Sequence, residues 1–562
     1  MNRTALLHIT DSNYCFPVSG NEIVIRFRAA KNDLKRVDLI YESKYFIAKR
    51  QKKAEMRKAY TTGLFDFYEI RLKLKDVRFA YIFLLDGDEG QFYYSEDGAT
   101  RDYDFSMCYY NFFQYPYINK ADVHETVGWL RTASIYQIFV DRFMMGNRDK
   151  DRSYIDMKWT DRPTPKSHAG GDLKGITKKL GYIKGLGFDT VYLTPIFRSG
   201  SNHKYDIEDY YLVDPQFGTN EDLKELIDKA HGKHMHIILD AVFNHCSENI
   251  AQFRDVVKKG RKSKYFDWFI IDGDEINENR SNYEVFATCH YMPKLNTSNP
   301  EVQEYLLGIA VHYIEKYGID GWRLDVSDEI SHDFWRKFRI AVKEAGKRVG
   351  KEIAIIGENW HDAASYLRGD QYDSIMNYGV TKACLDHFAF EKFDAEEFAG
   401  RLNEILVRNT TTVNDMMMNL LDCHDTVRFI TSIKGNKTRL KAALALIYLF
   451  PGAPCVYYGT EILTEGGPDP DCRRCMDWNK AGSAEYADIA ELLKTLSAIR
   501  KKQKLYDGEI GVCAVKGTFV FKNENKKRTI TLKIKLAKNG KDRFELSIKD
   551  NKNKGAEERI YG

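Results

Sequence analysis

The sequence predicts an α/β protein built around a (β/α)8 (TIM) barrel, with an all-β domain before it and a short β domain after it. Three observations predict this fold: eight apolar runs alternate with helical segments in the middle of the chain, and strand-like alternation precedes and follows them. With 562 residues, 43% of them hydrophobic, the chain is long and apolar enough for several cores. We expect domains at 1–122, 123–503 and 504–562.

The first domain is predicted from short alternating runs between residues 22 and 117. Residues 22–28 (EIVIRFR) and 78–85 (RFAYIFLL) are two of these runs, and the turn-forming segment 86–90 (DGDEG) follows the second. Short strands separated by turn signals are typical of a β-sandwich. We therefore predict an N-terminal β-sandwich over residues 1–122.

The barrel is predicted from eight short apolar runs, each followed by a helical segment. The runs begin at Ile135, Thr190, His236, Gly321, Ala354, Ser374, Met417 and Pro454. One intervening helix is especially clear, because Asn299 can cap it, Pro300 suits its first position, and apolar residues follow at spacings of three and four until Tyr317, just before Gly318.

Two further segments complete the domain assignment. Residues 246–298 are too many for an ordinary connection after the third run, so they predict a small excursion domain. The last segment, 504–562, returns to alternation in runs such as 518–521 (TFVF) and 529–534 (TITLKI) amid many lysines. It predicts a short C-terminal β domain.

Charge and hydropathy exclude some classes of function. Lys and Arg total 85 and Asp and Glu total 81, a net charge of +4, which is too small an excess to indicate a nucleic-acid-binding protein. No apolar run approaches the ~20 residues of a membrane span. The first residues, MNRTALLH, are not followed by a secretory signal pattern. We therefore expect a cytoplasmic protein with no nucleic-acid or membrane partner.

Polar residues end four of the apolar runs, where a barrel of this kind carries its active site. Asp240 ends the third run, Asp325 the fourth, Glu358 the fifth and Asp425 the seventh. Arg323 lies two residues before Asp325 and therefore shares its strand face. A single acid of this kind is more often a surface or structural carboxylate, but four strand ends together indicate a site.

The motifs around these residues resemble the alpha-amylase family of retaining glycoside hydrolases. They occur in order as DAVFNH (240–245), GWRLDVSDE (321–329), GENW (357–360) and LLDCHD (420–425). The resemblance covers roughly residues 129–500. Three further segments resemble the neopullulanase, cyclomaltodextrinase and maltogenic amylase branch, which also carries an N-terminal sandwich: HKYDIEDY (203–210), MPKLN (292–296) and DPDCRR (469–474).

The resemblance implies the catalytic roles. It makes Asp325 the nucleophile, Glu358 the acid/base, and Asp425 a third carboxylate that binds the 2- and 3-hydroxyls of the reacting glucose. Cleavage with retained configuration requires one ionised and one protonated carboxyl group. We expect Arg323 to keep Asp325 ionised, and we expect like charge from Asp325 to raise the pKa of Glu358. We expect Asp240 to organise the site.

The resemblance also implies the sugar contacts. Tyr205 is expected to stack under the reacting sugar beside His203, and His245 and His424 are expected to donate hydrogen bonds to it. Asp469 and Arg473 are expected to bind sugars further from the scissile bond, and Phe286 and Trp360 to line the acceptor side. For these last four, a role in packing is an open alternative.

Relatives bind calcium in the loop after the first barrel strand, and this sequence departs from their pattern. The matching ligand candidates are Asn147, Asp151, Gly170 and Asp172. Met145 and Lys150 stand where oxygen ligands are expected, and neither supplies one. A lysine ammonium could instead take the place of the ion. We therefore expect no required cofactor, with calcium as an alternative.

The resemblance implies retaining hydrolysis of α-1,4-glucosidic bonds in cyclomaltodextrins and maltooligosaccharides, with pullulan as a further candidate substrate, by an enzyme that forms a homodimer. A 4-alpha-glucanotransferase or debranching variant is the alternative. Asn359, which stands where an aliphatic residue is common, leaves the ratio of hydrolysis to transfer open. A non-catalytic glucan-binding protein of this fold is a third alternative, and it should lack one of the acids.

Overall fold

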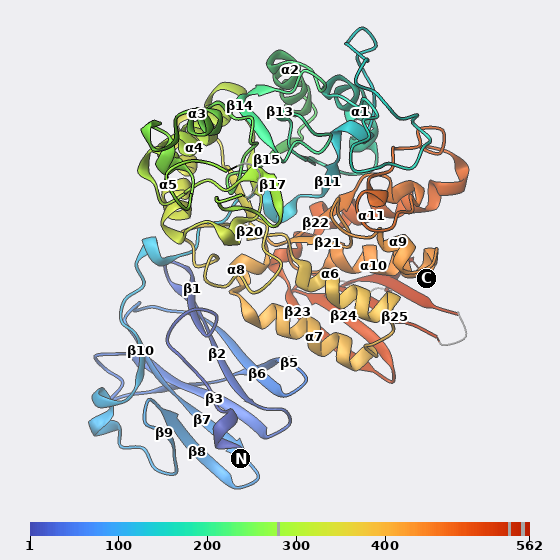
Figure 1. Ribbon diagram of the computed structural model, residues 1–562. Helices are drawn as coiled ribbons and strands as arrows, with labels where there is room; N and C mark the ends of the chain where they lie inside the picture. Colours follow the sequence, from blue (N-terminus) through green and yellow to red (C-terminus); the bar gives the residue numbers. More distant parts are fainter. Residues whose placement is uncertain (278–280, 538–540, 552–556, 562) are drawn as a thin grey trace. The chain divides into compact units, whose positions relative to one another are not determined.

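The computed structural model describes the chain except residues 278–280, 538–540, 552–556 and 562. The described residues form two compact units. The first comprises Met1–Thr126, Glu391–Asp415 and Asp507–Gly562, and the second comprises Val127–Phe390 and Met416–Tyr506. Figure 1 shows the chain and labels many of its helices and strands.

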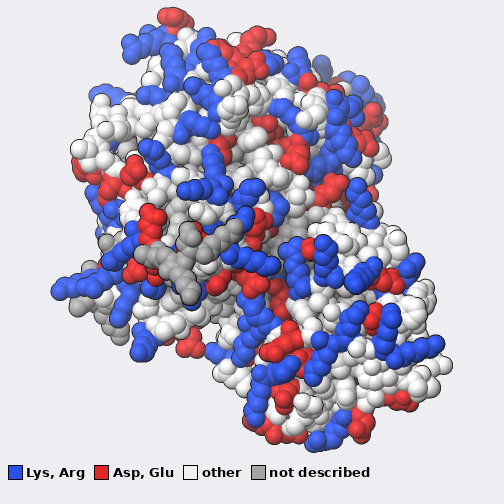
Figure 2. All heavy atoms as spheres, turned by 180° about the vertical axis from the view of Figure 1, so that it is seen from behind, with Lys and Arg blue, Asp and Glu red and all other residues white. Residues whose placement is uncertain are grey.

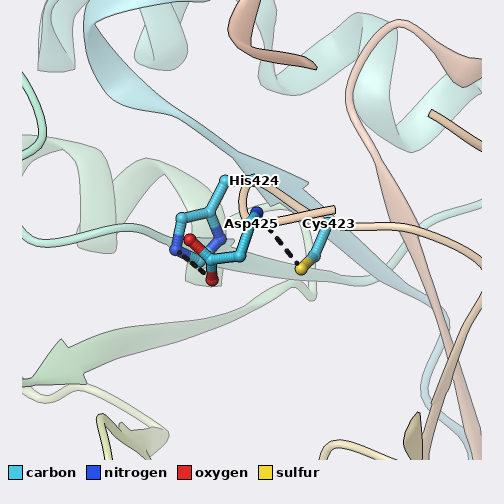
Figure 3. A group of neighbouring side chains, drawn as sticks. All are labelled: Cys423, His424 and Asp425. Carbon is cyan, nitrogen blue, oxygen red and sulfur yellow. Dashed lines mark hydrogen bonds and ion pairs between the residues drawn. The ribbon is translucent and has the colours of Figure 1, made fainter. Parts of the chain in front are cut away.

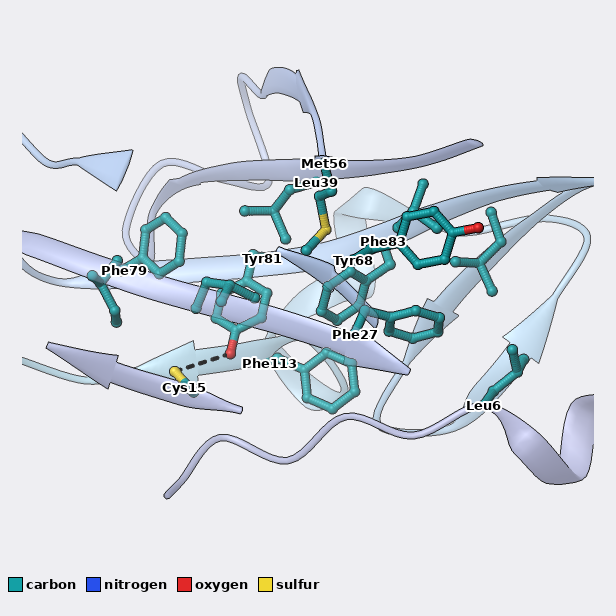
Figure 4. Close-up of a cluster of buried hydrophobic side chains, with 14 of the residues drawn as sticks. Leu6, Cys15, Phe27, Leu39, Met56, Tyr68, Phe79, Tyr81, Phe83 and Phe113 are labelled. Carbon is teal, nitrogen blue, oxygen red and sulfur yellow. Dashed lines mark hydrogen bonds between the residues drawn. The ribbon is translucent and has the colours of Figure 1, made fainter. Parts of the chain in front are cut away.

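The N-terminal segment is a β-sandwich, as predicted. One sheet has the order β1-β2-β6-β5 and the other β4-β3-β7-β8-β9, with β10 paired to β7. The strands are β1 (Cys15–Ser19), β2 (Glu22–Ala30), β3 (Leu34–Ser43), β4 (Lys52–Glu55), β5 (Arg57–Thr61), β6 (Phe65–Lys73), β7 (Phe79–Gly87), β8 (Gly90–Ser95), β9 (Gly98–Thr100) and β10 (Phe113–Tyr115). Alternate side chains of facing strands, such as Phe27 and Phe83, fill the core between them (Figure 4).

The C-terminal segment forms an antiparallel sheet in the order β23-β24-β25-β26-β27. Its strands are β23 (Glu509–Val515), β24 (Thr518–Glu524), β25 (Arg528–Lys535), β26 (Arg543–Asp550) and β27 (Glu558–Tyr561). Helix α7 (Ala395–Arg408) packs on this sheet, and Asn403 Nδ2 donates to the carbonyls of Thr61 (2.8 Å) and Val512 (3.0 Å). Segment 391–415, which includes α7 and α8 (Thr411–Asn414), therefore lies in the first unit, although it falls inside the range predicted for the barrel.

The second unit contains the predicted barrel. Its parallel strands have the order β20-β19-β18-β15-β12-β11-β22-β21, and a parallel bridge between Met376 and Met418 joins the two ends of the sheet. The strands are β11 (Ile135–Ile138), β12 (Thr190–Leu193), β15 (His236–Ala241), β18 (Gly321–Leu324), β19 (Ala354–Gly357), β20 (Ser374–Ile375), β21 (Met418–Leu420) and β22 (Ala453–Tyr457). Both faces of these strands are buried, which explains their continuous apolar runs.

The helices that follow the strands are amphipathic or buried. They are α1 (Leu173–Gly185), α2 (Asn220–His231), α4 (Pro300–His312), α5 (His332–Arg348), α6 (Tyr378–Cys384), α9 (Phe429–Ser432), α10 (Lys437–Leu449) and α11 (Ala487–Gln503). The start of α4 is as predicted: the Asn299 side chain accepts the Glu301 N–H at 2.8 Å, and Pro300 is the first residue. A π-helical turn extends α4 to Tyr317, and Gly318 ends it with φ of 78°.

Two excursions follow the second and third barrel strands. β13 (Phe197–Ser199) and β14 (Ile207–Val213) form a hairpin whose connection carries His203 and Tyr205. The longer excursion contains α3 (Ala251–Lys259), β16 (Val285–Phe286) and β17 (Cys289–Pro293). It returns to the barrel through a bridge between His245 and Lys294.

Two surface features bear on the predicted partners. Figure 2 shows Lys and Arg side chains interspersed with Asp and Glu on the face drawn there, which agrees with the small net charge. Among the residues that the structure describes, no helix is long and apolar enough to cross a membrane.

Candidate active site

The carboxyl ends of three neighbouring barrel strands bring four of the predicted site residues together. In the register of β15 and β18, Asp240 lies opposite Arg323. In the register of β18 and β19, Leu324 lies opposite Gly357, so that the next residues, Asp325 and Glu358, leave adjacent strand ends. Adjacent parallel strands in this register place their terminal side chains around one point.

The guanidinium of Arg323 lies at the centre of these acids. Its Nη1 donates to Asp325 Oδ1 at 2.7 Å and to both carboxylate oxygens of Asp240 at 3.0 Å. Its Nη2 forms an ion pair with Glu358 Oε2 at 2.8 Å. All four residues are buried. Asp325 and Glu358 are therefore fixed on two nitrogens of one planar group, the geometry that a guanidinium provides and an ammonium does not.

A strained backbone conformation also positions Glu358. Val326 has φ of 45° and ψ of 45°, the left-handed region that β-branched residues rarely adopt. In this conformation its N–H donates to Glu358 Oε2 at 2.9 Å. The Ser327 hydroxyl donates to the Glu358 carbonyl at 2.6 Å. The segment directly after Asp325 thus binds both the side-chain carboxylate and the backbone carbonyl of Glu358.

Burial and mutual repulsion control the protonation of these acids. Burial raises the pKa of Asp325 well above its usual range; Arg323 lowers this pKa, while Glu358 and Asp240 raise it. Burial likewise raises the pKa of Asp240, to about 6. We expected from the sequence that Arg323 keeps Asp325 ionised. Arg323 does lower the pKa of Asp325, but burial raises this pKa by more. One guanidinium thus faces three carboxyl groups, and burial together with the neighbouring carboxyl groups raises the pKa of both Asp325 and Asp240.

A second hydrogen-bonded chain runs from Asp240 to His424. Asp240 Oδ2 accepts hydrogen bonds from Tyr192 (2.6 Å) and Tyr205 (3.2 Å). The Tyr205 hydroxyl also bonds His424 Nε2 at 2.5 Å, and the Gln137 amide lies 2.8 Å from His424 Nδ1. With the amide as donor, Nε2 carries the imidazole proton and donates it to Tyr205. Burial lowers the pKa of His424 well below its usual value, which keeps the ring neutral.

Asp425 lies at the more open side of this chain, next to Arg473. Arg473 Nη2 donates to Asp425 Oδ1 at 3.1 Å, and Nη1 pairs with Asp469 Oδ1 at 2.9 Å. His424 Nε2 lies 3.1 Å from Asp425 Oδ2 (Figure 3). The Asp425 side chain is 30% exposed, so it can reach a ligand while Arg473 fixes its direction. Figure 3 also shows Cys423, whose sulfur accepts the Asp425 N–H at 3.4 Å.

The two remaining histidines and Phe286 border the same group. His245 Nε2 lies 3.9 Å from Asp325 Oδ2, and the His245 ring stacks on Phe286 with 4.6 Å between ring centroids. Burial lowers the pKa of His245 to about 3 and that of His203 to about 4. His203 stacks against Tyr205 with 5.9 Å between centroids. These histidines are therefore neutral hydrogen-bonding groups near neutral pH.

Comparison with known families agrees with this arrangement. Residues 137–505 match the family described as alpha amylase, catalytic domain, and residues 1–119 match the alpha amylase N-terminal ig-like domain. The chain belongs to the alpha-amylase family. It is a glycoside hydrolase of that family.

Individual members of the family are similar over nearly the whole chain. A cyclomaltodextrinase of Thermoanaerobacter pseudethanolicus is 42% identical over 535 residues, covering 94% of this chain and 92% of that protein. Neopullulanase 2 of Thermoactinomyces vulgaris is 38% identical over 557 residues (94% and 92%). A solved cyclomaltodextrinase structure superposes with a TM-score of 0.89 at 35% identity, covering 95% of this chain and 91% of that one. The chain thus belongs to the cyclomaltodextrinase, neopullulanase and maltogenic amylase branch.

Trp360, predicted on the acceptor side, lies on an aromatic support. Its ring stacks on Tyr378 with 3.8 Å between centroids and planes 6° apart. Trp360 is 47% exposed whereas Tyr378 is 6% exposed. One face of the indole is thus covered by a buried ring, and the remaining exposed surface is available to a sugar.

Several residues of this alpha-amylase site were not found from the sequence. They are Gln137, Tyr192, Val326, Ser327 and Tyr378. Gln137 offered a signal, because it is a polar residue inside an otherwise apolar strand. Val326 offered none, since its role depends on its backbone conformation and not on its side chain.

Of the four predicted calcium ligands, Gly170 and Asp172 face Lys150, whereas Asn147 and Asp151 bond to other groups. The Nζ of Lys150 lies 2.8 Å from the Gly170 carbonyl and 3.2 Å from Asp172 Oδ2. Asn147 Oδ1 accepts the Asp149 N–H at 3.1 Å instead. Asp151 is exposed, and its carboxylate accepts the N–H and hydroxyl of Ser153. The residues present therefore do not fit the six to eight oxygen ligands that calcium takes.

Proposed function

We propose that this alpha-amylase family hydrolase cleaves α-1,4-glucosidic bonds of cyclomaltodextrins and maltooligosaccharides with retention of configuration, and accepts pullulan as a further substrate. The observation that carries the proposal is the attachment of Asp325 and Glu358 to one guanidinium, at 2.7 and 2.8 Å. The names of the similar proteins, cyclomaltodextrinase and neopullulanase 2, support the substrate class.

In the first chemical step, the Asp325 carboxylate attacks the anomeric carbon of the glucose to be transferred. The bond from that carbon to the leaving glucosyl oxygen breaks, and the proton held on Glu358 moves to this oxygen. The shared guanidinium keeps the two carboxyl groups at a fixed separation throughout. Arg323 also compensates charge as the proton leaves the cluster.

In the second step, a water molecule takes the place of the released sugar. Glu358, now ionised, accepts a proton from the water, whose oxygen attacks the anomeric carbon as the ester bond to Asp325 breaks. Two inversions restore the α configuration. His245, 3.9 Å from Asp325 Oδ2, is placed to hydrogen-bond the sugar beside the ester.

Substrate positioning falls to the more open part of the site. Asp425, fixed by Arg473, is proposed to hold the 2- and 3-hydroxyls of the reacting glucose, and Tyr205 to lie against its ring. Trp360, backed by Tyr378, is proposed to hold the acceptor sugar. Asp469 pairs with Arg473 and therefore belongs to the same wall of the site.

The test compares β-cyclodextrin, maltotriose, pullulan and soluble starch under identical conditions, with products resolved by chromatography and the first-formed anomer identified by NMR. We expect fast cleavage of the cyclodextrin with α-anomeric maltose among the first products. First products in the β configuration would contradict the retaining mechanism.

Transfer to sugar acceptors is the alternative outcome at the same site. Asn359 is buried, and its Oδ1 accepts the His361 N–H at 2.9 Å, so a polar residue lies directly after the acid/base. Accumulation of products longer than maltotriose from pure maltotriose would identify a glucanotransferase. We expect maltose and glucose to predominate.

We further propose that the chain forms a homodimer through the N-terminal sandwich. Several large rings are exposed there: Tyr45, Phe46, Tyr109, Tyr110 and Tyr117. They are neighbours, because the Tyr109 hydroxyl donates to the Tyr45 carbonyl and Arg78 lies over the rings of Tyr45 and Tyr117. Clustered exposed rings are typical of interfaces. Light scattering should give twice the chain mass, and a monomer at working concentration would contradict this.

We also propose a cytoplasmic location. All ten cysteines are free thiols, which is expected of a reducing compartment. A relative that is 37% identical over 516 residues is named intracellular maltogenic amylase in Bacillus subtilis. Cell fractionation tests this, and activity in the culture medium of intact cells would contradict it.

A further inference from the structure

The ammonium group of Lys150 lies in a cradle of oxygen atoms beside the barrel. Its Nζ donates to the carbonyls of Gln216 (2.7 Å) and Gly170 (2.8 Å) and pairs with Asp172 Oδ2 at 3.2 Å. The Lys150 side chain is only 6% exposed and that of Asp172 only 1%. Three donor protons thus meet three oxygen atoms, and one positive charge meets one carboxylate.

The oxygen atoms of this cradle come from two segments, the one that contains Gly170 and Asp172 and the turn that contains Gln216, and Lys150 itself comes from a third. Asp172 caps α1 by accepting the Gly175 N–H at 2.7 Å, and it also accepts the N–H groups of Gly146 (2.9 Å) and Asn147 (3.0 Å). The loop after β11, the start of α1 and the turn that contains Gln216 are therefore joined through Lys150 and Asp172. Joining loops through oxygen atoms is what a bound metal cation does.

The cradle is linked to the segment that carries the stacking residue. The Gln216 side-chain oxygen accepts a hydrogen bond from Lys204 Nζ at 2.6 Å, and Lys204 also pairs with Asp214 at 2.9 Å. Lys204 is fully buried and has φ of 63°. It directly precedes Tyr205. Gln216 thus binds Lys150 through its backbone and the Tyr205 segment through its side chain.

We propose that the Lys150 ammonium is a built-in cation that replaces the calcium ion of related proteins, so that the fold is stable without calcium. Three features support this: the oxygens face Nζ, the remaining candidate ligands Asn147 and Asp151 bond to neighbouring backbone N–H groups, and the Met145 side chain contains no oxygen. The inference concerns stability and does not rest on the proposed substrate.

The first test measures thermal unfolding of the metal-stripped full chain in EGTA and in millimolar calcium chloride, together with elemental analysis. We expect the same Tm in both solutions, and no stoichiometric calcium after purification. A Tm that falls in EGTA, or one calcium ion per chain, would overturn the proposal. Neither result depends on activity.

The second test changes the lysine itself. Lys150→Met keeps the length of the side chain but leaves Asp172 buried without a cation, so we expect Tm to fall by roughly 5 °C. The control is Lys166→Met, an exposed lysine of the following loop, which should leave Tm unchanged. An unchanged Tm in Lys150→Met would contradict the role of the ammonium.

The third test asks whether the cradle is a cation position. Lys150→Asn removes the ammonium and supplies an amide oxygen near the three oxygen atoms that have lost the ammonium as their partner. In EGTA its Tm should fall as in Lys150→Met, and calcium should then raise it by several degrees, an effect absent from the unmodified chain. If calcium leaves the Tm of Lys150→Asn unchanged, the cradle is not a divalent-cation position and the proposal fails.

Discussion

The phenol of Tyr205 and the imidazole of His424 share a hydrogen bond of 2.5 Å, and their ring planes differ by only 3°. The two rings come from distant parts of the chain, one from the β13–β14 connection and the other from the segment after β21. Their hydrogen bond links Asp240, and through it Arg323, to His424 beside Asp425. The acids of the site are therefore joined by one continuous polar network.

The Tyr205→Phe variant tests this network. The change keeps the aromatic ring but removes the hydroxyl, so Asp240 Oδ2 loses one of its donors and His424 loses the hydrogen bond that links it to Asp240. We expect kcat/KM to fall by about 10- to 100-fold, corresponding to roughly 1.5–3 kcal/mol. Tyr211→Phe on β14, away from these residues, is the control. Wild-type kcat/KM in Tyr205→Phe would show that only the ring matters.

The Asp325→Asn variant tests the nucleophile. An amide of the same shape can still accept from Arg323 but cannot form the ester, so turnover should fall by at least about 10³-fold while Tm stays within a few degrees. Asp333→Asn, on the exposed side of α5, is the matched control. Near-normal turnover in Asp325→Asn, measured on β-cyclodextrin, would refute the assignment.

The Arg323→Lys variant tests the shared guanidinium. A lysine keeps the charge but has one nitrogen in place of two, so it cannot hold Asp325 and Glu358 at once. We expect turnover to fall by at least roughly 100-fold and the free energy of unfolding by about 3 kcal/mol, because carboxylates remain buried without a full partner. Arg336→Lys, whose arginine pairs with Asp370 at the surface, should change neither quantity. Equal activity of the two variants would contradict the account.

The sandwich should lose stability in mild acid because of His8. Burial lowers the pKa of His8 to about 4 from its ordinary 6.5; its Nδ1 bonds the Arg26 carbonyl (2.7 Å) and its Nε2 the Tyr81 hydroxyl (2.8 Å). Between these two pH values the unfolded chain binds a proton that the folded chain does not, so the free energy of unfolding falls as pH decreases.

From pH 7 to pH 5 the loss from His8 should be about 2 kcal/mol. His8→Gln keeps a polar group at this position and does not titrate, so its unfolding free energy should depend less on pH by this amount. Urea denaturation at both pH values measures the difference. Identical pH dependence in the two proteins would show that His8 is protonated in the folded state.

The sequence was sufficient for the barrel and the main acids, because both leave local patterns. Buried parallel strands produce continuous apolar runs, and polar residues at their ends identify the face that carries the site. Asp240, Arg323, Asp325 and Glu358 could be found in this way. The cap of α4 at Asn299 could likewise be read directly from its neighbours.

Other features depend on distant contacts and left no local pattern. The left-handed backbone of Val326 accompanies a hydrogen bond to Glu358, 32 residues further along the chain. Helix α7 has an ordinary amphipathic sequence, and only its contacts with β5, β23 and β24 place it in the first unit. The raised pKa of Asp325 likewise results from burial and from two other carboxyl groups, which no single motif contains.

Trapping the covalent intermediate tests the central claim most directly. In Glu358→Gln, an α-maltosyl fluoride can form the ester without acid assistance, because fluoride is a good leaving group, whereas hydrolysis of the ester is slow without the base. Peptide mapping by mass spectrometry should find one maltosyl group on the peptide that contains Asp325. A maltosyl group on another carboxylate, or release of β-maltose without any labelled peptide, would contradict the account.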